Sequence, residues 1–214
     1  MLFPTEEQGK IKRILYSGQF EAAILAASGK VASDVLDNLY REVKYVLELN
    51  HLTRIPLKNE YETPHSLGKD RLAAAVGANL LYPEAKMLVI DLGTAITYEY
   101  VIEGSYLGGN ISPGMSTRFA SLHQMTDKLP HLSAQKDFQS PGKNTNQAIL
   151  AGVIQGILFE LNEYIQRFTT DYPTGMILFT GGDSNFFAEK INSPIFVHSD
   201  LVLLGLNSIL EFNR

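Results

Sequence analysis

Alternating apolar and polar positions along the chain predict a series of strands and helices. Compact apolar runs at 22–27, 87–90 and 176–180 have the length and composition of strands that are buried on both faces. Between them, apolar residues recur at helical spacing, which gives each predicted helix one apolar face. This mixture of strands and helices predicts an α/β fold.

The first sixty residues are predicted to form a strand–helix–strand unit. Ser33 or Asp34 can cap a helix that follows the run at 22–27. The apolar face of that helix is expected at Leu36, Leu39, Tyr40, Val43 and Leu47. Leu52–Ile55 is the candidate for the second strand, and Pro56 ends it. A strand, a crossover helix and a second strand predict a parallel pair.

The rest of the chain alternates in the same way, with glycine-containing turns between the elements. Strands are expected at Ala95–Ile102, at Ile195–Val197, and from Tyr106 into a glycine-rich loop that ends at Gly114. Helices are expected at Asp70–Leu81, Met115–Lys128, Asn146–Phe168, Ser184–Lys190 and Leu201–Phe212. Gly152 and Gly156 would let another helix pack closely. Residues 129–146 are interpreted as a polar loop, a candidate lid or partner-contacting segment.

Composition narrows the class of protein. The chain has 214 residues, 45% of them apolar and 19% charged, which suits one large globular domain or two small ones that share a cleft. The net charge of −5 argues against a broad nucleic-acid-binding face, and the absence of cysteine excludes disulfides and thiolate metal sites. No signal-peptide pattern and no apolar run of about 18 residues is visible, so we expect a cytoplasmic location and no membrane contact.

The hairpin predicted around Asp91 carries the first candidate chemistry. The strand at 87–90 leads into Asp91, and Gly93 and Thr94 follow before the returning strand. A carboxylate, a hydroxyl and backbone N–H groups at one turn suit a phosphate and its counter-cation. An ordinary Asp/Gly turn after a buried strand has the same residues, so the choice depends on the neighbouring motifs.

Asp70 and Arg71 stand at the start of a predicted helix and form a second candidate. The helix dipole alone favours an aspartate there. Arginine gains nothing from the dipole, so Arg71 indicates a partner, which is either an internal carboxylate or an anionic ligand.

Glycine turns at 108–114 and at Thr180–Gly182 add to these candidates. In an open α/β sheet such turns cluster at one edge, where ligands bind. Glycine turns, hydroxyls, an arginine and two carboxylates suit phosphoryl transfer. The sequence contains no Gly-x-x-x-x-Gly-Lys-Ser/Thr and no Gly-x-Gly-x-x-Gly, which excludes a P-loop and leaves a dinucleotide fold without support.

Five motifs, taken together, resemble those of the type III pantothenate kinases, which belong to the superfamily of acetate and sugar kinases, actin and heat-shock ATPases. They follow the family's order from Tyr61 to the C-terminal region. They are Tyr61-x-x-Pro-x-x-Leu-Gly-x-Asp-Arg71, Asp91-x-Gly-Thr-Ala-x-Thr97, Gly108-Gly-x-Ile-x-Pro-Gly114, Gly142-x-Asn-Thr145 and Thr180-Gly-Gly182. The resemblance implies an actin-like, ribonuclease H-like fold with two related subdomains around a cleft, at 1–85 and 86–214, the first of them incomplete.

The resemblance also implies an activity, which is ATP-dependent phosphorylation of pantothenate to 4′-phosphopantothenate, the first step of coenzyme A biosynthesis. Asp70 would be the general base that takes the proton from the primary hydroxyl. Pantothenate would be held by Tyr61, Gly68, Lys69, Asp70, Arg71 and Thr145. Thr145 would reach the substrate of the partner subunit, so that a homodimer completes each site.

The cofactors implied are ATP with Mg²⁺ and a monovalent cation, either potassium or ammonium. Thr94, Gly181 and Gly182 would contact ATP, and Asp91 would carry the monovalent cation.

One family motif has no counterpart in the first sixty residues. Members of the family begin with a strand that leads into an Asp-x-Gly-Asn turn, the first phosphate loop, and the nearest candidate, Ala27–Lys30, has no carboxylate. The beginning of the first subdomain is therefore expected to be shortened, through either a misassigned start codon or a real loss of the opening strands. A real loss would severely impair ATP affinity and turnover. Two alternatives stay open: a non-catalytic relative that acts as a ligand-binding or transcription accessory protein, and a kinase of another small alcohol.

Overall fold

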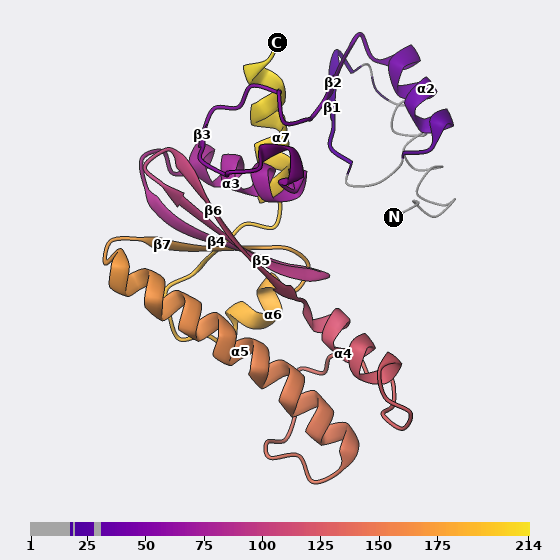
Figure 1. The fold of residues 1–214 in the computed structure, drawn as a ribbon, viewed down its shortest axis with the longest axis vertical. Helices are drawn as coiled ribbons and strands as arrows, with labels where there is room; N and C mark the ends of the chain where they lie inside the picture. The colour runs from indigo at the N-terminus through magenta and orange to yellow at the C-terminus, as the bar shows by residue number, and fades with distance from the viewer. Residues whose placement is uncertain (1–17, 19, 28–30) are drawn as a thin grey trace.

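A computed structural model describes residues 18, 20–27 and 31–214. Its main feature is a six-stranded mixed sheet in the order β3-β6-β5-β4-β7-β8 (Figure 1). The strands are β3 (Lys58–Asn59), β4 (Lys86–Leu92), β5 (Ala95–Ile102), β6 (Ser105–Pro113), β7 (Met176–Thr180) and β8 (Phe196–Val197). β4, β5 and β6 form an antiparallel meander, whereas β7 pairs with β4 and with β8 in parallel.

β4 lies inside the sheet because both of its faces are apolar. Leu88 and Ile90 face one core cluster, and Met87 and Val89 face the other. Successive side chains of a strand point to opposite faces, so a short continuous apolar run can fill two cores at once. The prediction of a strand buried on both faces at 87–90 is confirmed.

Helices cover both faces of this sheet (Figure 1). α3 (Lys69–Leu81) and α7 (Leu201–Phe212) pack on one face. α5 (Thr145–Asp171) and α6 (Ser184–Ala188) pack on the other, and α4 (Met115–Gln124) packs against α5. The helices predicted from apolar periodicity are therefore present, although α4 ends four residues before the expected boundary at Lys128.

α3 and α7 approach one another to backbone contact because glycines stand where they cross. A Cβ atom at Gly77 would lie 2.2 Å from the carbonyl oxygen of Leu201. A Cβ atom at Gly205 would lie 1.8 Å from the carbonyl oxygen of Ala73. This contact fixes α3, whose first turn carries Asp70, against α7 and the sheet.

The N-terminal part described by the structure forms a separate two-stranded unit. β1 (Ala22–Leu25) and β2 (Tyr45–Glu48) pair in parallel, with α2 (Ser33–Glu42) as the crossover helix. The predicted strand–helix–strand unit is confirmed, but the second strand expected at Leu52–Ile55 is wrong. α2 ends earlier than expected, so Leu47 lies in β2 and not on the helical face. The residue that caps α2 is Ala32, without a side-chain hydrogen bond, so the expected cap by Ser33 or Asp34 is also wrong.

Two further expectations need correction. Residues 108–113, expected to be a glycine-rich loop, belong to β6 and pair with β5 as far as Pro113. No helix packs closely at Gly152 in the described chain, because a Cβ atom there would meet nothing within 4 Å. The segment between α4 and α5 contains no helix or strand, as expected for a polar loop.

The division of the chain at residue 85 stays a prediction. β3 and α3 precede that boundary, yet β3 extends the six-stranded sheet and α3 packs on it. α5 is the one described helix that is long and apolar enough to span a membrane by length and composition. Its buried residues run from Ile149 to Phe168 and face the sheet, so core packing accounts for its apolar character.

Candidate active site

Asp91, Thr97 and Thr180 stand side by side at one end of the sheet. Asp91 of β4 pairs in register with Thr97 of β5 and with Thr180 of β7. Residues opposite each other on neighbouring strands point to the same face, and here it is the face that α3 covers. The hydroxyl oxygen of Thr97 is buried and has no hydrogen-bond partner among the described residues. This end of the sheet therefore offers a carboxylate and two hydroxyls together.

The turn between β4 and β5 is held by close backbone contacts. The N–H of Gly114 and the hydroxyl of Thr117 both donate to the carbonyl oxygen of Thr94, at 2.9 and 2.6 Å. A Cβ atom at Gly114 would lie 1.9 Å from the carbonyl oxygen of Gly93. Glycine is thus required at 114 for α4 to start so near the turn, and Thr94 is left exposed at its tip.

The turn after β7 lies against the same hairpin. Gly181 has a φ of 89°, and a Cβ atom there would lie 2.4 Å from Oδ1 of Asp91. The N–H of Asp183 donates to the carbonyl oxygen of Leu92 at 2.9 Å. The two turns expected at strand ends therefore share one edge of the sheet.

A cavity of about 420 Å³ opens beside these turns. Thr94, Gly182 and Asp183 line it from the strand ends, Phe119 lines it from α4, and residues 131–134 close it from the loop. Burial raises the pKa of Asp183. Hydroxyl and backbone groups at two glycine-containing turns suit a phosphate-bearing ligand.

Asp70 reaches the same end of the sheet from the first turn of α3. Burial, and after it the nearby charges of Asp70 and Glu99, raise the pKa of Asp91 to about 6. Oδ1 of Asp70 accepts a hydrogen bond of 2.9 Å from the N–H of Arg71, and the Asp70 side chain is exposed. A Cβ atom at Gly68 would lie 2.6 Å from the same Oδ1 atom, so glycine leaves room for the carboxylate.

Arg71 is paired with a carboxylate inside the protein. Its Nε and Nη2 donate to Oε1 and Oε2 of Glu99 at 2.7 and 2.8 Å. Burial alone lowers the pKa of Arg71, but the bonds to Glu99 raise it above its ordinary value. Of the two partners that its position indicated, an internal carboxylate and an anionic ligand, the structure contains the first.

Tyr61 covers this ion pair. The centre of the Arg71 guanidinium lies 5.7 Å from the centroid of the Tyr61 ring, and Tyr61 stacks on Tyr106 at 6.1 Å. Gly108, with a φ of 115°, has the Tyr61 ring beside it. Lys69 points elsewhere, since it lines two small cavities next to the N-terminal unit.

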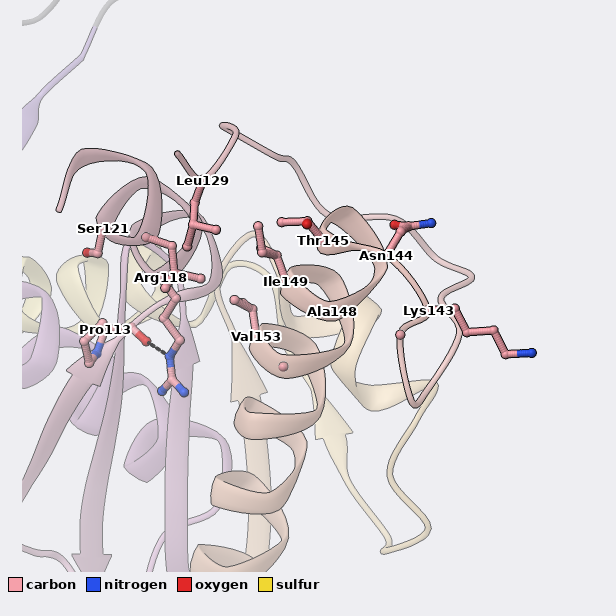
Figure 2. A pocket seen from close by; sticks show the side chains of 13 residues that line it. Pro113, Arg118, Ser121, Leu129, Lys143, Asn144, Thr145, Ala148, Ile149 and Val153 are labelled. Atoms are coloured by element: carbon pink, nitrogen blue, oxygen red, sulfur yellow. Dashed lines mark hydrogen bonds between the residues drawn. The ribbon is translucent and has the colours of Figure 1, made fainter. Parts of the chain in front are cut away.

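Thr145 lies in a different groove. This groove has a volume of about 930 Å³ and runs between α4 and α5, and neither Asp70 nor Arg71 lines it. Figure 2 shows Arg118 of α4 and Ile149 and Val153 of α5 around it, with Thr145 at the start of α5. Within one subunit the structure therefore does not bring Thr145 together with Asp70.

The oxygen groups around Asp91 are of the kind that hold a hard cation. No group of three or more His, Asp or Glu side chains that could hold a metal occurs among the described residues. A carboxylate with neighbouring hydroxyls supplies hard oxygen ligands. The unpartnered hydroxyl of Thr97 is a second sign that something polar belongs there.

Comparison with protein families identifies the chain. The sequence model of the type III pantothenate kinases matches residues 9–167. The chain belongs to the type III pantothenate kinase family. The type III pantothenate kinase of Phocaeicola vulgatus is 45% identical over 191 residues, which cover 89% of this chain and 79% of that protein. The corresponding enzyme of Cytophaga hutchinsonii is 38% identical over 210 residues, covering 98% and 89%.

A solved structure supports the fold of this family member. A conserved protein of the Baf family of transcriptional activators from Campylobacter jejuni superposes with a TM-score of 0.63, at 21% identity, covering 95% of this chain and 88% of that one. The predicted α/β fold is confirmed by the mixed sheet with helices on both faces and by this likeness. At this identity the likeness concerns the fold alone.

Sequence reasoning about this pantothenate kinase family member missed Glu99 and Tyr106. Both lie in strands, where a single polar residue among apolar ones gives no periodic signal. A fully buried glutamate at the centre of a strand is unusual unless it is paired, and Arg71 was the available partner.

Proposed function

We propose that this chain transfers the γ-phosphoryl group of ATP to the primary hydroxyl of pantothenate and so makes 4′-phosphopantothenate, the first step of coenzyme A biosynthesis. Membership of the type III pantothenate kinase family supports the reaction. The observation that carries the assignment of roles is that the charge of the exposed Asp70 adds to burial in raising the pKa of Asp91. Oδ1 of Asp91 in turn lies 2.4 Å from where a Cβ atom at Gly181 would stand. A base for the alcohol and a place for phosphates then share one edge of the sheet.

Asp70 acts as the general base in this proposal. Its side chain is exposed at a helix start, so it can reach the hydroxyl proton of a bound alcohol. Tyr61, Gly68 and Arg71 contact pantothenate in this proposal. Lys69 follows Gly68 in the chain and takes part from the side that faces the N-terminal unit. In phosphoryl transfer the protein mainly positions the reactants and offsets charge, which these residues suit.

ATP occupies the cavity beside Thr94, Gly181 and Gly182 in this proposal. Mg²⁺ bound to ATP would neutralise part of the negative charge on the phosphates. Asp91 holds potassium or ammonium, with the hydroxyls of Thr97 and Thr180 beside it. A cation there offsets the repulsion between Asp91, Asp70 and Glu99, which adds to burial in raising the pKa of Asp91.

The proposal includes a homodimer. Thr145 lines a groove that none of the other residues assigned to pantothenate lines, so we assign it to the substrate of the partner subunit. The groove beside it then forms part of the interface between two copies. We expect the enzyme to work in the cytoplasm, without nucleic acid or membrane as a partner.

Substitution of the base tests the function. Wild-type chain with ATP, Mg²⁺, potassium and pantothenate should form 4′-phosphopantothenate, and Asp70→Asn should lower kcat by roughly a hundredfold to ten-thousandfold, as the loss of a general base does. Calorimetry should still detect pantothenate binding to Asp70→Asn.

If the wild type binds pantothenate but not ATP, a non-catalytic role as a ligand-binding or transcription accessory protein replaces this proposal. Preference for another alcohol in a competition assay would indicate the other alternative, a kinase of another small alcohol.

A further inference from the structure

Glu99 is the most buried charged group of the described chain. Its exposed fraction is 0%, and Arg71, at 6%, is the other buried charged residue among the described ones. Both Glu99 oxygens are used: Oε1 accepts from Arg71, and Oε2 accepts from Arg71 at 2.8 Å and from the hydroxyl of Tyr106 at 2.6 Å. A buried ion pair of this kind adds little net stability compared with apolar residues of the same shape. In some proteins such a pair is kept because it fixes the arrangement of the side chains around it.

The geometry that Glu99 fixes is that of the candidate pantothenate site. Through Arg71 it holds the first turn of α3, where the N–H of Arg71 donates to Asp70. Through Tyr106 it holds the ring on which Tyr61 stacks. Gly109 is required for this arrangement, since a Cβ atom there would lie 2.8 Å from Oε2 of Glu99 and 1.7 Å from the carbonyl oxygen of Tyr98.

We propose that Glu99 and Tyr106 are positioning residues of the alcohol-substrate site, which orient Arg71 and Tyr61 and align Asp70 without touching the substrate. Of the two partners of the Glu99 carboxylate, Arg71 is itself assigned to pantothenate, and Tyr106 stacks on Tyr61, which is also assigned to it. Neither is assigned to ATP. The inference rests on the proposed function and adds the residues that hold its substrate site in shape.

The test compares two fully buried tyrosines of the same sheet whose hydroxyls donate to different carboxylates. Tyr106→Phe keeps the ring that stacks on Tyr61 and removes the bond to Glu99. Tyr98→Phe is the matched control, because Tyr98 is equally buried in the same sheet and donates at 2.7 Å to Glu160 on the opposite face. Glu99→Gln keeps the shape of the side chain and leaves Arg71 without its counter-charge. The measurements are KM for pantothenate and for ATP, kcat, the pantothenate Kd from calorimetry, and Tm.

Positioning predicts an effect on one substrate only. Glu99→Gln should raise KM and Kd for pantothenate at least about tenfold and Tyr106→Phe about threefold to tenfold, while KM for ATP stays within about twofold. Tyr98→Phe should lower Tm as much as Tyr106→Phe does and leave the pantothenate constants unchanged. If Glu99→Gln does not fold, the pair of tyrosine variants still decides.

Four outcomes overturn the inference. Equal changes in both KM values, or equal effects of Tyr106→Phe and Tyr98→Phe on the pantothenate KM and Kd, would show that the network only stabilises the fold. A wild-type chain that neither binds nor phosphorylates pantothenate overturns the proposed function, and the inference with it. Wild-type activity with unaffected variants overturns the inference alone.

Discussion

Three carboxylates reach one end of the sheet from different elements, and each has a different environment. Asp70 is exposed at a helix start, Asp91 is partly buried at a strand end, and Glu99 is fully buried in a strand and paired with Arg71. The environment separates the roles that the side chains can take. An exposed carboxylate can exchange a proton with a substrate, a half-buried one can hold a cation, and a saturated one can only fix its partners.

The raised pKa of Asp91 predicts a pH dependence of stability. Its folded-state pKa of about 6 exceeds the unfolded value of 3.8, so the folded state favours the protonated form. The contribution of Asp91 to stability is fully present below about pH 4 and is lost as the pH rises through about 6. Between these pH values the free energy of unfolding of the wild type should fall by on the order of 2 kcal/mol relative to Asp91→Asn.

Urea unfolding of both proteins from pH 4 to pH 7, in a buffer of tetramethylammonium, measures this difference. Potassium should reduce it, because a cation beside Asp91 favours the ionised carboxylate. A difference that is independent of pH would contradict the assignment of Asp91 as a strained, partly buried carboxylate.

At the scale of elements, periodicity predicted most of the sheet and its helices because their apolar residues are regular and continuous. It failed for β2, since Val43 and Leu47 continue the helical spacing of α2 by coincidence while the chain has already turned into a strand. The strand candidate at Leu52–Ile55 was wrong because pairing with β1 depends on tertiary contacts that no local pattern contains. The loop expected at 108–113 failed for a related reason, because β5 supplies the partner that keeps glycines in a strand.

In the candidate site too, residues that belong to local motifs could be predicted, and a residue whose role depends on tertiary contacts could not. Asp70, Asp91 and the glycine turns carry motifs and could be predicted. Glu99 could not, because its role arises only when β5 is placed under α3.

The close crossing of α3 and α7 predicts opposite effects for two glycines. Gly205→Ala should destabilise the protein by roughly 1–3 kcal/mol, since its Cβ atom would lie 1.8 Å from the carbonyl oxygen of Ala73 and the helices must separate. Gly156→Ala is the control inside α5, where a Cβ atom would meet only Nη1 of Arg118, at an ordinary contact distance of 3.9 Å. It should stabilise the protein by about 0.5–1 kcal/mol through helix propensity.

Thermal and urea unfolding of the two variants measure the changes. A neutral Gly205→Ala would mean that α3 and α7 can move apart without cost, and the placement of Asp70 would then be less rigid than the structure indicates.

At the scale of the whole molecule, the residues assigned to pantothenate fall into two places. Asp70 stands beside the hairpin tip, whereas Thr145 lines the groove between α4 and α5. No rearrangement of side chains joins them, because they belong to different helices on opposite faces of the sheet. If both places serve pantothenate, as proposed, one subunit alone presents two incomplete parts, and we expect a symmetric pair of subunits to complete both.

A mixture of two defective variants tests this completion. If Thr145 serves the site of the partner subunit, a mixed dimer of Asp70→Asn and Thr145→Ala has one site with both defects and one site with neither. Mixing equal amounts, with time for the subunits to exchange, should restore activity toward about a quarter of the wild-type value, because about half of the dimers are mixed and each has one intact site. The activity of the mixture should clearly exceed the mean of the two variants measured separately.

As a control, Asp70→Asn mixed with Asp70→Asn,Thr145→Ala should restore nothing, because every site then lacks its base. If the first mixture gives only the mean of its components, Thr145 acts within its own subunit or takes no part in the reaction, and the assignment of the groove to the dimer interface is wrong.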